Sequence, residues 1–400
     1  MLGDIITGNR DLNLTANDSL ANGVKDAYRD AGIATLSMGT DKQGVAAKID
    51  AGTGNVSLLM ADGSDKTNHM AGSISVNSIT GATIKLINQG NGAGTVGDLP
   101  DLAANCCGFD LGYRGIGADV TLNAGAVLSA SGAGTAVTLA AKGNFNNNSG
   151  NGAGSIAMSD PAARWLVYAN APGGSTYGGL DSQNTAIWNA SYTGTPVTQT
   201  GNRYMFAYQP TITVGTQNVS KTYGEDLSTG TTLADRVVSL SGADAGIAGA
   251  YLGDTVATAL SGIITATSAG AAANAGVAGG PYAITVDLSG ATGNNGYAVA
   301  LGSNTPRTIT VAAKALTASL TGVSKVYDAS NAATLASGNY VLSGLVGSES
   351  FSITKTSGLF NASDISASSV SATLAAGDFS AGAATFASNY ILPVSATGTG

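Results

Sequence analysis

Arg164-Trp165-Leu166-Val167-Tyr168 separates two parts of the sequence that differ in composition and pattern. Residues 1–163 contain no tryptophan and few aromatic residues, whereas most of the tyrosines follow this stretch. We interpret it as the boundary between two β architectures. We expect an aromatic cap over the end of an apolar column here, and a connector behind it. The cap residues would be Trp165, Leu166 and Tyr168, and the connector would contain Trp188, Tyr192 and Tyr204.

Before the boundary, short runs alternate between apolar and polar residues and are separated by Gly and Asn. The runs are Val56-Ser57-Leu58, Ile74-Ser75-Val76, Ile84-Lys85-Leu86, Val120-Thr121-Leu122, Val137-Thr138-Leu139 and Ile156-Ala157-Met158. Such alternation is typical of half-buried strands. Intervals of 18, 17 and 19 residues separate Val56 from Ile74, Val120 from Val137 and Val137 from Ile156. We assign each interval to one coil of a right-handed parallel β-helix, because sandwich strands recur at roughly 8 to 12 residues.

Three segments interrupt or end the expected coils. Leu20 to Asp30 is compatible with a short inserted helix. Asn88 to Gly117 is rich in glycine at its flanks and predicts a loop outside the coil. Gly143 to Asn148 ends the regular region, and there we expect stacked asparagine side chains along a corner and Phe145 as a cap on the apolar column.

After the boundary, the sequence repeats itself. Val219-Ser220-Lys221-Thr222-Tyr223 returns 104 residues later as Val323-Ser324-Lys325-Val326-Tyr327. Thr211 to Val214 returns 97 residues later as Thr308 to Val311. Two modules of this size, built from short alternating strands, favour small antiparallel sandwiches of immunoglobulin-like kind. The tyrosines expected to hold these sandwiches together, by ring packing and hydroxyl hydrogen bonds, are Tyr223, Tyr297, Tyr327 and Tyr390.

The predicted fold is therefore all-β, a right-handed parallel β-helix followed by two immunoglobulin-like β-sandwich modules. The predicted domains are a β-helix shaft at 1–160, a cap and connector at 161–209, a first module at 210–310 and a second module at 311–400.

Composition narrows the classes of partner. Charged residues make up only 10% of the chain and the net charge is −8, so no basic surface for nucleic acid is expected. No apolar run approaches the roughly 18 residues that span a bilayer. Residues 1–6 do not resemble a signal peptide. If the protein is exported, we therefore expect this chain to be an internal piece of a longer one or the product of a gene whose start is assigned wrongly.

Few residues are candidates for chemistry. His69 is the only histidine, and it is expected in a solvated polar turn. Cys106 and Cys107 are adjacent, which leaves two loop thiols or a strained vicinal disulfide as alternatives. Asp110, Arg114 and Asp119 are the nearest approach to a polysaccharide-cleaving cluster. Glu225-Asp226 alone cannot complete a calcium cage. We therefore assign no catalytic, cofactor-binding or metal-binding residue and no cofactor.

Several motifs resemble known families. Residues 143–150 (GNFNNNSG) and 163–180 (ARWLVYANAPGGSTYGGL) resemble the end of the shaft in filamentous-haemagglutinin-type adhesins, the exported partners of two-partner secretion systems. VSKTYG, GPYAITV and NNGYAVAL of the first module resemble the MBG module. VSKVYDASNAATL, GNYVLSGLVG and SNYILPV of the second resemble the YDG module, with Asp328-Ala329 where Asp-Gly is usual.

The resemblance implies a non-catalytic segment of a secreted bacterial surface adhesin that attaches to host cells, matrix or other bacteria. It also implies an outer-membrane two-partner secretion transporter as the export partner, a surface receptor or glycan of unknown identity, and an extracellular location. Two alternatives remain open, a structural spacer without a ligand of its own and a polysaccharide-cleaving β-helix.

Overall fold

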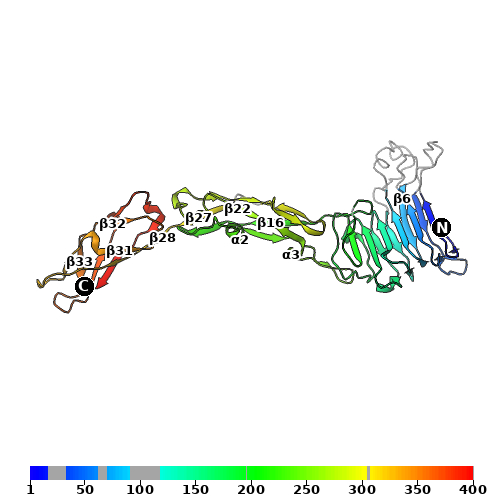
Figure 1. Ribbon diagram of the computed structural model, residues 1–400, viewed down its shortest axis with the longest axis horizontal. Helices are drawn as coiled ribbons and strands as arrows, with labels where there is room; N and C mark the ends of the chain where they lie inside the picture. Colours follow the sequence, from blue (N-terminus) through cyan, green and yellow to red (C-terminus); the bar gives the residue numbers. More distant parts are fainter. Residues whose placement is uncertain (17–32, 62–69, 91–117, 195, 304–306, 400) are drawn as a thin grey trace, which may run out of the picture. The chain divides into compact units, whose positions relative to one another are not determined.

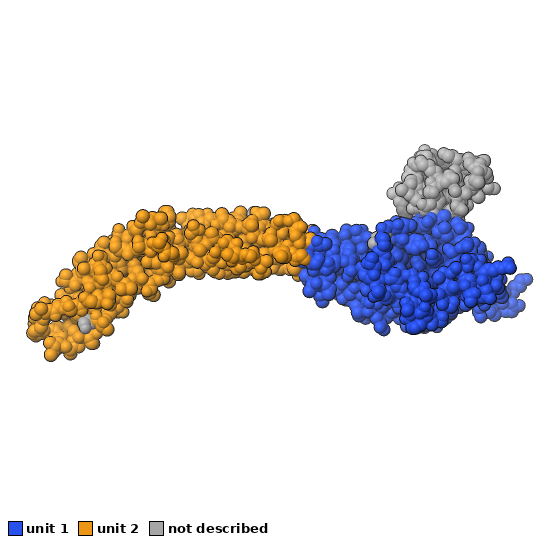
Figure 2. Space-filling model, in the orientation of Figure 1, with its two compact units in different colours: residues 1–212, 242–261, 292–299 blue, residues 213–241, 262–291, 300–400 orange. Residues whose placement is uncertain are grey.

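The structure is a computed structural model that describes residues 1–16, 33–61, 70–90, 118–194, 196–303 and 307–399. Contacts divide the chain into two compact units, which Figure 2 colours separately. The first unit comprises residues 1–212, 242–261 and 292–299. The second unit comprises residues 213–241, 262–291 and 300–400. The first module, predicted as one domain at 210–310, therefore contributes residues to both units.

The first unit is a parallel β-helix with three sheets along its stack, visible as the blue-to-green strands of Figure 1. One sheet contains β1 (Ile5–Ile6), β4 (Ile49–Asp50), β7 (Ile79–Gly81), β10 (Leu128–Ala130) and β13 (Ile156–Met158). The second contains β2 (Leu12–Ala16), β5 (Val56–Met60), β8 (Ile84–Asn88), β11 (Thr135–Ala141), β14 (Arg164–Ala169) and β15 (Arg203–Phe206). The third contains β3 (Ile33–Ser37), β6 (Met70–Val76), β9 (Val120–Leu122) and β12 (Phe145–Asn147). All six predicted strand runs are confirmed.

The length of a coil differs from the prediction. Leu128 pairs with Ile156, 28 positions later, and Ile49 pairs with Ile79, 30 positions later. The predicted coil of 17 to 19 residues is therefore wrong. Val56 and Ile74, for example, lie in β5 and β6, which belong to different sheets. The interval of 17 to 19 residues is the distance along the chain between strands of two different sheets. Alternation marks a strand, but it does not show to which sheet the strand belongs.

Inward-pointing side chains stack in register along the coils. One ladder in the second sheet consists of Leu14, Leu58, Leu86, Leu139, Val167 and Tyr204. All of these except Leu14 have no exposed surface. Burial of each large aliphatic side chain contributes about 1.5–3 kcal/mol, so the ladder is a main source of stability.

The stack continues beyond residue 160. β14 pairs with β11 and β15 pairs with β14, so residues assigned to the cap and connector are rungs. Trp165 points inward, with its ring 5.1 Å from that of Tyr204. Leu166 and Tyr168 lie in a separate cluster on the outer face with Ile87. The cap prediction for Trp165, Leu166 and Tyr168 is wrong, because neighbouring residues of a strand face opposite sides.

A cluster of aromatic residues lies at this end of the β-helix, and Trp165 and Phe145 belong to it as rungs of β14 and β12. Around Tyr204 lie Phe145, Trp165, Tyr177, Phe206 and Tyr251, and Trp188 packs on Phe206 and Tyr251. Tyr251 comes from the distant segment 242–261. The edge of β15 is covered as well, since Ile187 N–H donates to Tyr204 O and Phe206 N–H donates to Ile187 O.

Asparagines do stack at a corner, but at other positions than expected. Asn123 Nδ2 donates to Asn77 Oδ1 at 2.9 Å, and Asn77 Nδ2 donates to the backbone oxygens of Gly39 and Ala47. Phe145 is fully buried as a rung of β12 opposite Val120 rather than as a cap. The corner therefore joins three coils through amide side chains.

The remaining strands and the α-helices that the structure describes belong to the two modules. Those of the first module are β16 (Thr211–Thr216), β17 (Val219–Thr222), α2 (Thr232–Val237), β18 (Val238–Ser241), β19 (Gly246–Ile247), β20 (Tyr251–Leu252), α3 (Val256–Ala259), β21 (Leu260–Gly262), β22 (Thr265–Thr267), β23 (Tyr282–Ala283), β24 (Thr285–Asp287), β25 (Ala291–Gly293), β26 (Ala298–Leu301) and β27 (Thr308–Ala312). Those of the second are β28 (Lys314–Ala315), β29 (Thr317–Leu320), β30 (Ala332–Thr334), β31 (Tyr340–Ser343), β32 (Phe351–Ile353), β33 (Ser357–Phe360), β34 (Ser369–Thr373), β35 (Phe379–Ala381), β36 (Tyr390–Ile391) and β37 (Ser395–Thr399). The all-β prediction, a parallel β-helix followed by β modules, is confirmed.

Strand pairing fixes how the two modules correspond. Thr213 of β16 pairs with Ser241, and Thr317 of β29 pairs with Ser343. Thr213 and Thr317 are 104 positions apart, the same interval as in the repeated Val-Ser-Lys-x-Tyr motif. β27 instead pairs with β17, so the echo of 211–214 at 308–311 does not mark the start of the second module.

Some predicted features fall outside the described residues. These are the helix at 20–30, the part of the loop from 91 to 117, the Cys106-Cys107 pair and His69. Among the helices that the structure describes, none is long and apolar enough to cross a membrane.

Candidate functional site

Among the acidic candidates from the sequence, the structure describes Asp119, Glu225 and Asp226. Asp110 and Arg114 lie outside the described residues. Asp119 accepts hydrogen bonds from Asn144 N–H at 2.7 Å and from Asn146 Nδ2 at 3.2 Å, so it fastens a turn between coils. In the described part of the chain, no three His, Cys, Asp or Glu side chains are grouped closely enough to hold a metal ion.

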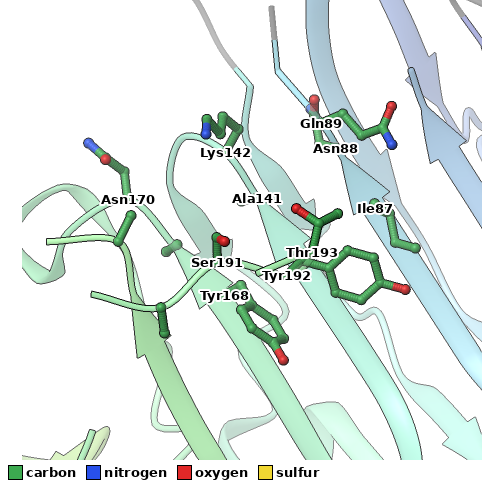
Figure 3. Close-up of a pocket in the computed structure, with 14 residues that line it drawn as sticks. Ile87, Asn88, Gln89, Ala141, Lys142, Tyr168, Asn170, Ser191, Tyr192 and Thr193 are labelled. Carbon is green, nitrogen blue, oxygen red and sulfur yellow. The ribbon is translucent and has the colours of Figure 1, made fainter. Parts of the chain in front are cut away.

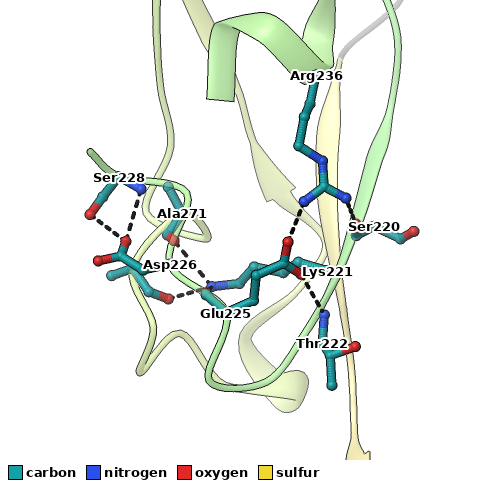
Figure 4. A network of polar contacts seen from close by, with 9 residues as sticks. Ser220, Lys221, Thr222, Glu225, Asp226, Ser228, Arg236 and Ala271 are labelled. Carbon is teal, nitrogen blue, oxygen red and sulfur yellow. Dashed lines mark hydrogen bonds and ion pairs between the residues drawn. The ribbon is translucent and has the colours of Figure 1, made fainter. Parts of the chain in front are cut away.

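Glu225 and Asp226 have structural partners. Glu225 forms an ion pair of 2.5 Å with Arg236. Asp226 accepts from both the N–H and the hydroxyl of Ser228, and these bonds hold its pKa below the usual value. Figure 4 shows that the two carboxylates engage different neighbours. They do not converge on a common point that a cation could occupy.

A pocket of about 210 Å³ lies on the outer face of the β-helix. The ends of β8, β11 and β14 form its floor, and residues 190–193 form a wall. Figure 3 shows the rings of Tyr168 and Tyr192 on one side and the side chains of Lys142 and Asn170 on the other. The rings of the two tyrosines meet edge to face, with centroids 5.7 Å apart. The pocket thus combines an aromatic wall with polar side chains.

The polar side chains of this pocket differ in whether they already have hydrogen-bond partners. Asn88 Nδ2 donates to Gly72 O and to Asp119 O, so its amide holds the backbone together. Lys142 Nζ and the Asn170 amide make no hydrogen bond or ion pair with any described residue. An aromatic face beside free donors and acceptors is the usual combination for a small polar ligand such as a sugar.

A lysine organises the loop after the repeated motif in each module. Lys221, only 3% exposed, donates to the backbone oxygens of Glu225, Ala271 and Ala272 (Figure 4). Burial lowers its pKa from the ordinary value. In the second module, Lys325 donates in the same manner to Ser330 O and Ala332 O, at 2.6 Å and 3.0 Å. Both lysines therefore hold the backbone of a loop in place through hydrogen bonds.

A carboxylate shared by two aromatic donors lies in the first unit. Tyr297 donates from its hydroxyl to Asp254 Oδ2 at 2.9 Å, and the hydroxyl accepts from Asp244 N–H. Trp188 Nε1 donates to the same Asp254 oxygen over a long 3.5 Å. The two rings meet at 5.8 Å. We call Trp188, Asp254 and Tyr297 the first carboxylate joint.

The second unit contains the same arrangement. Tyr223 donates to Glu349 Oε1 at 2.6 Å, and Tyr390 donates to Glu349 Oε2. The hydroxyl of Tyr390 accepts from Val346 N–H at 2.9 Å, and the two rings meet edge-on at 5.4 Å. Burial and then Glu349 raise the pKa of both tyrosines to about 12. We call Tyr223, Glu349 and Tyr390 the second carboxylate joint.

The two joints follow one plan. Each closing tyrosine accepts from a backbone N–H that follows a Ser-Gly pair by two positions, at Asp244 and at Val346. Each also donates to a carboxylate that binds a second aromatic donor from outside its own closing segment. In both joints, the shared carboxylate fastens the module to the structure that precedes it in sequence.

Three of the four predicted structural tyrosines are confirmed. Tyr223, Tyr297 and Tyr390 are at most 5% exposed. Tyr327 is 64% exposed, so the prediction for it is wrong. Its counterpart Tyr223 is buried because Glu349 and Tyr390 cover it, and the structure describes no such cover over Tyr327. Asp254 and Glu349 had no signal in the sequence, since they do not align at the 104-residue interval.

A YDG domain model matches residues 305–399. No curated protein and no solved structure gave a match to the chain. The matched range contains the motifs at 323–394 on which the YDG-like module at 311–400 was predicted, including Tyr327 and Tyr390. Residues 305–399 are therefore a YDG domain, a module that fits a non-catalytic surface protein.

Proposed function

We propose that this chain is a non-catalytic segment of a secreted bacterial surface adhesin, and that the pocket beside Tyr168 and Tyr192 is its attachment site. The pocket is the observation on which the proposal rests. It offers an aromatic wall together with Lys142 and Asn170, whose side-chain polar atoms have no partner among the described residues. A glycan of a host or bacterial surface suits this chemistry, because its C–H face packs on a ring while its hydroxyls hydrogen-bond.

Export by an outer-membrane two-partner secretion transporter and an extracellular location belong to the same proposal. The YDG domain at 305–399 supports it. So does a parallel β-helix whose coils pair mainly with their neighbours, since such a chain can fold coil by coil. Weak single contacts gain strength when many copies act together, which is how a small pocket can mediate attachment.

A spacer without a ligand is the second candidate, and the carboxylate joints favour it. Each joint buries its aromatic donors and fastens consecutive parts of the chain, as a load-bearing stalk requires. Under this alternative the pocket is a packing irregularity, and binding resides in other parts of the parent protein.

A glycan array probed with the full 400-residue chain separates the two. We expect binding that Tyr192→Ala weakens about tenfold, since loss of a ring contact costs on the order of 1 kcal/mol. Tyr327→Ala is the matched control, because it removes an exposed tyrosine away from the pocket. Absence of binding above background, or equal losses in both variants, would favour the spacer.

The polysaccharide-cleaving alternative can be tested on the same protein. Turnover of uronic-acid polymers that is lost in Asp119→Ala would support it. Because Asp119 fastens a turn, unfolding of that variant must be monitored in parallel by circular dichroism.

A further inference from the structure

One repeated motif has two different environments in the second unit. Tyr223 of the first copy is 3% exposed and Tyr327 of the second copy is 64% exposed. Both tyrosines follow a lysine by two positions and a buried valine by four. The difference therefore lies in what covers the tyrosine.

The second module covers Tyr223 with the carboxylate of Glu349 and the ring of Tyr390. Glu349 accepts the Tyr223 hydroxyl and the Tyr390 ring packs against it edge-on. The approach is close, because a Cβ added at Gly224 would lie 2.6 Å from Val346 Cγ2. A motif of this type in this chain is thus built to be covered by a loop carboxylate and a closing-strand tyrosine.

The loop that carries Tyr327 is already held in place without such a cover. Val323 is buried, and Lys325 bonds to Asp328, Ser330 and Ala332. Lys325 also lies 5.7 Å from the centre of the Phe360 ring. Little conformational freedom remains to be lost when a partner binds, which favours association.

Apolar side chains are exposed on this rigid loop and beside it. Val326 is 89% exposed and Ile365 is 95% exposed. Tyr327 and Ile365 line one hollow of about 200 Å³, with Phe360 at its base. Large apolar side chains gathered at one place mark an interaction surface rather than ordinary exterior.

We propose that Val326, Tyr327 and Ile365 form a docking face for a further β module of the same kind as residues 305–399. The loop carboxylate of that module would accept a hydrogen bond from the Tyr327 hydroxyl, and its closing-strand tyrosine would pack against the Tyr327 ring. We infer this partner from the second carboxylate joint, in which Glu349 and Tyr390 cover the tyrosine of the other copy of the motif. The first joint, where an indole N–H replaces the hydroxyl, shows that the carboxylate accepts different aromatic donors. The inference concerns this face alone and does not depend on attachment to a glycan.

One local difference separates the two copies of the motif. Asp328 stands where the first copy has Gly224. Its carboxylate turns back to Lys325 and to Ser330 N–H, away from the position of an incoming module. The docked module would therefore contact the ring and the hydroxyl of Tyr327. Its backbone would approach this loop less closely than the second module approaches Gly224.

The test extends the full chain by a second copy of residues 302–400 placed after Gly400. This start reproduces the spacing of the first module, because β27 follows β26 there. The appended copy carries Tyr327→Phe, so that the peptide with Tyr327 is unique. Tyrosine nitration followed by peptide mass spectrometry then reports the exposure of Tyr327, with Tyr208, 52% exposed in the first unit, as the control.

We expect nitration of Tyr327 to slow at least tenfold in the extended chain, toward the rate of Tyr223, while Tyr208 reacts as before. Glu349→Gln in the appended copy alone should restore much of the lost reactivity. An unchanged rate at Tyr327 beside a folded appended copy overturns the proposal. An appended copy that fails to fold by circular dichroism also counts against it, because a ready docking face should stabilise the module. Concentration-dependent protection of Tyr327 in the original chain would assign the face to self-association instead.

Discussion

The hydroxyl of Tyr223 donates a hydrogen bond of 2.6 Å to Glu349, which lies 126 positions further along the chain. The same carboxylate accepts the hydroxyl of Tyr390. Two tyrosines from the two modules of the second unit thus share one acceptor. Because the rings of both are buried, their hydroxyls have few alternative partners, and the carboxylate stabilises the contact between the modules.

Replacing Glu349 by Gln tests this contact. The variant keeps the size of the side chain but loses the charge that strengthens both hydrogen bonds, so we expect a loss of about 1–3 kcal/mol in the free energy of unfolding. Urea denaturation of the full chain, followed by tyrosine fluorescence, measures it. Glu225→Gln is the matched control, since its ion pair is exposed and is worth about 0–1 kcal/mol. Equal losses in the two variants would contradict the joint.

The second joint also predicts a pH dependence. Burial, and after it Glu349, raises the pKa of Tyr223 and of Tyr390 to about 12, whereas an unfolded tyrosine titrates near about 10. The folded state therefore binds these protons more tightly than the unfolded state. Their contribution to stability is complete below pH 10 and is lost as the pH rises from about 10 to about 12. Urea midpoints across this range should fall more steeply in the parent chain than in the Tyr223→Phe/Tyr390→Phe double variant. The variant should still decline, because burial also raises the pKa of tyrosines such as Tyr204 in the first unit.

Trp165 is a rung of the β-helix, and its truncation should destabilise the first unit. Trp165 is 2% exposed and packs against Tyr204, so Trp165→Ala should cost about 3–5 kcal/mol through lost burial and a cavity. Thermal unfolding followed by circular dichroism measures the effect. Tyr208→Ala serves as the control, since more than half of that side chain is exposed. A shift no larger than that of the control would show that Trp165 does not support the stack.

Replacing Ala329 by glycine should stabilise the folded chain. It has a φ of 61°, in the left-handed region that costs a non-glycine residue roughly 1–2 kcal/mol, and a glycine loses part of that gain to chain entropy. We expect Ala329→Gly to raise the free energy of unfolding by about 1 kcal/mol. At Ala336, where φ is −125°, the same change should destabilise. A gain at both positions would point to a cause other than backbone strain.

The sequence predicts strands well and their partners poorly. The alternation in Val56-Ser57-Leu58 and Ile74-Ser75-Val76 marks strands correctly, because period two follows from the pleat of each strand alone. Which sheet receives each strand depends on the turns between them, and those carry no comparable pattern. The predicted coil length is wrong for this reason. The cap prediction for Leu166 and Tyr168 is wrong because alternation assigns both to the outer face.

The same limit applies to the functional residues. The repeated motif located Tyr223 and its counterpart Tyr327, and strand pairing confirms the 104-residue correspondence. The motif could not show that one of them is covered, because burial of Tyr223 depends on a carboxylate 126 positions away. Asp254 and Glu349 occupy different positions in their modules, so a comparison of the two repeats does not reveal them either.

The hydrogen bonds that cover β15 also bear on solubility. A stack of parallel strands ends in a row of unpaired N–H and C=O groups, and such an edge is a template on which other chains add strands and form fibrils. Ile187 and Ala190 occupy these groups at β15, and Tyr251 covers the aromatic surface behind them. Recruitment of further strands is therefore blocked at this end of the β-helix. The residues that terminate the stack protect the protein from the aggregation that its own architecture would otherwise invite.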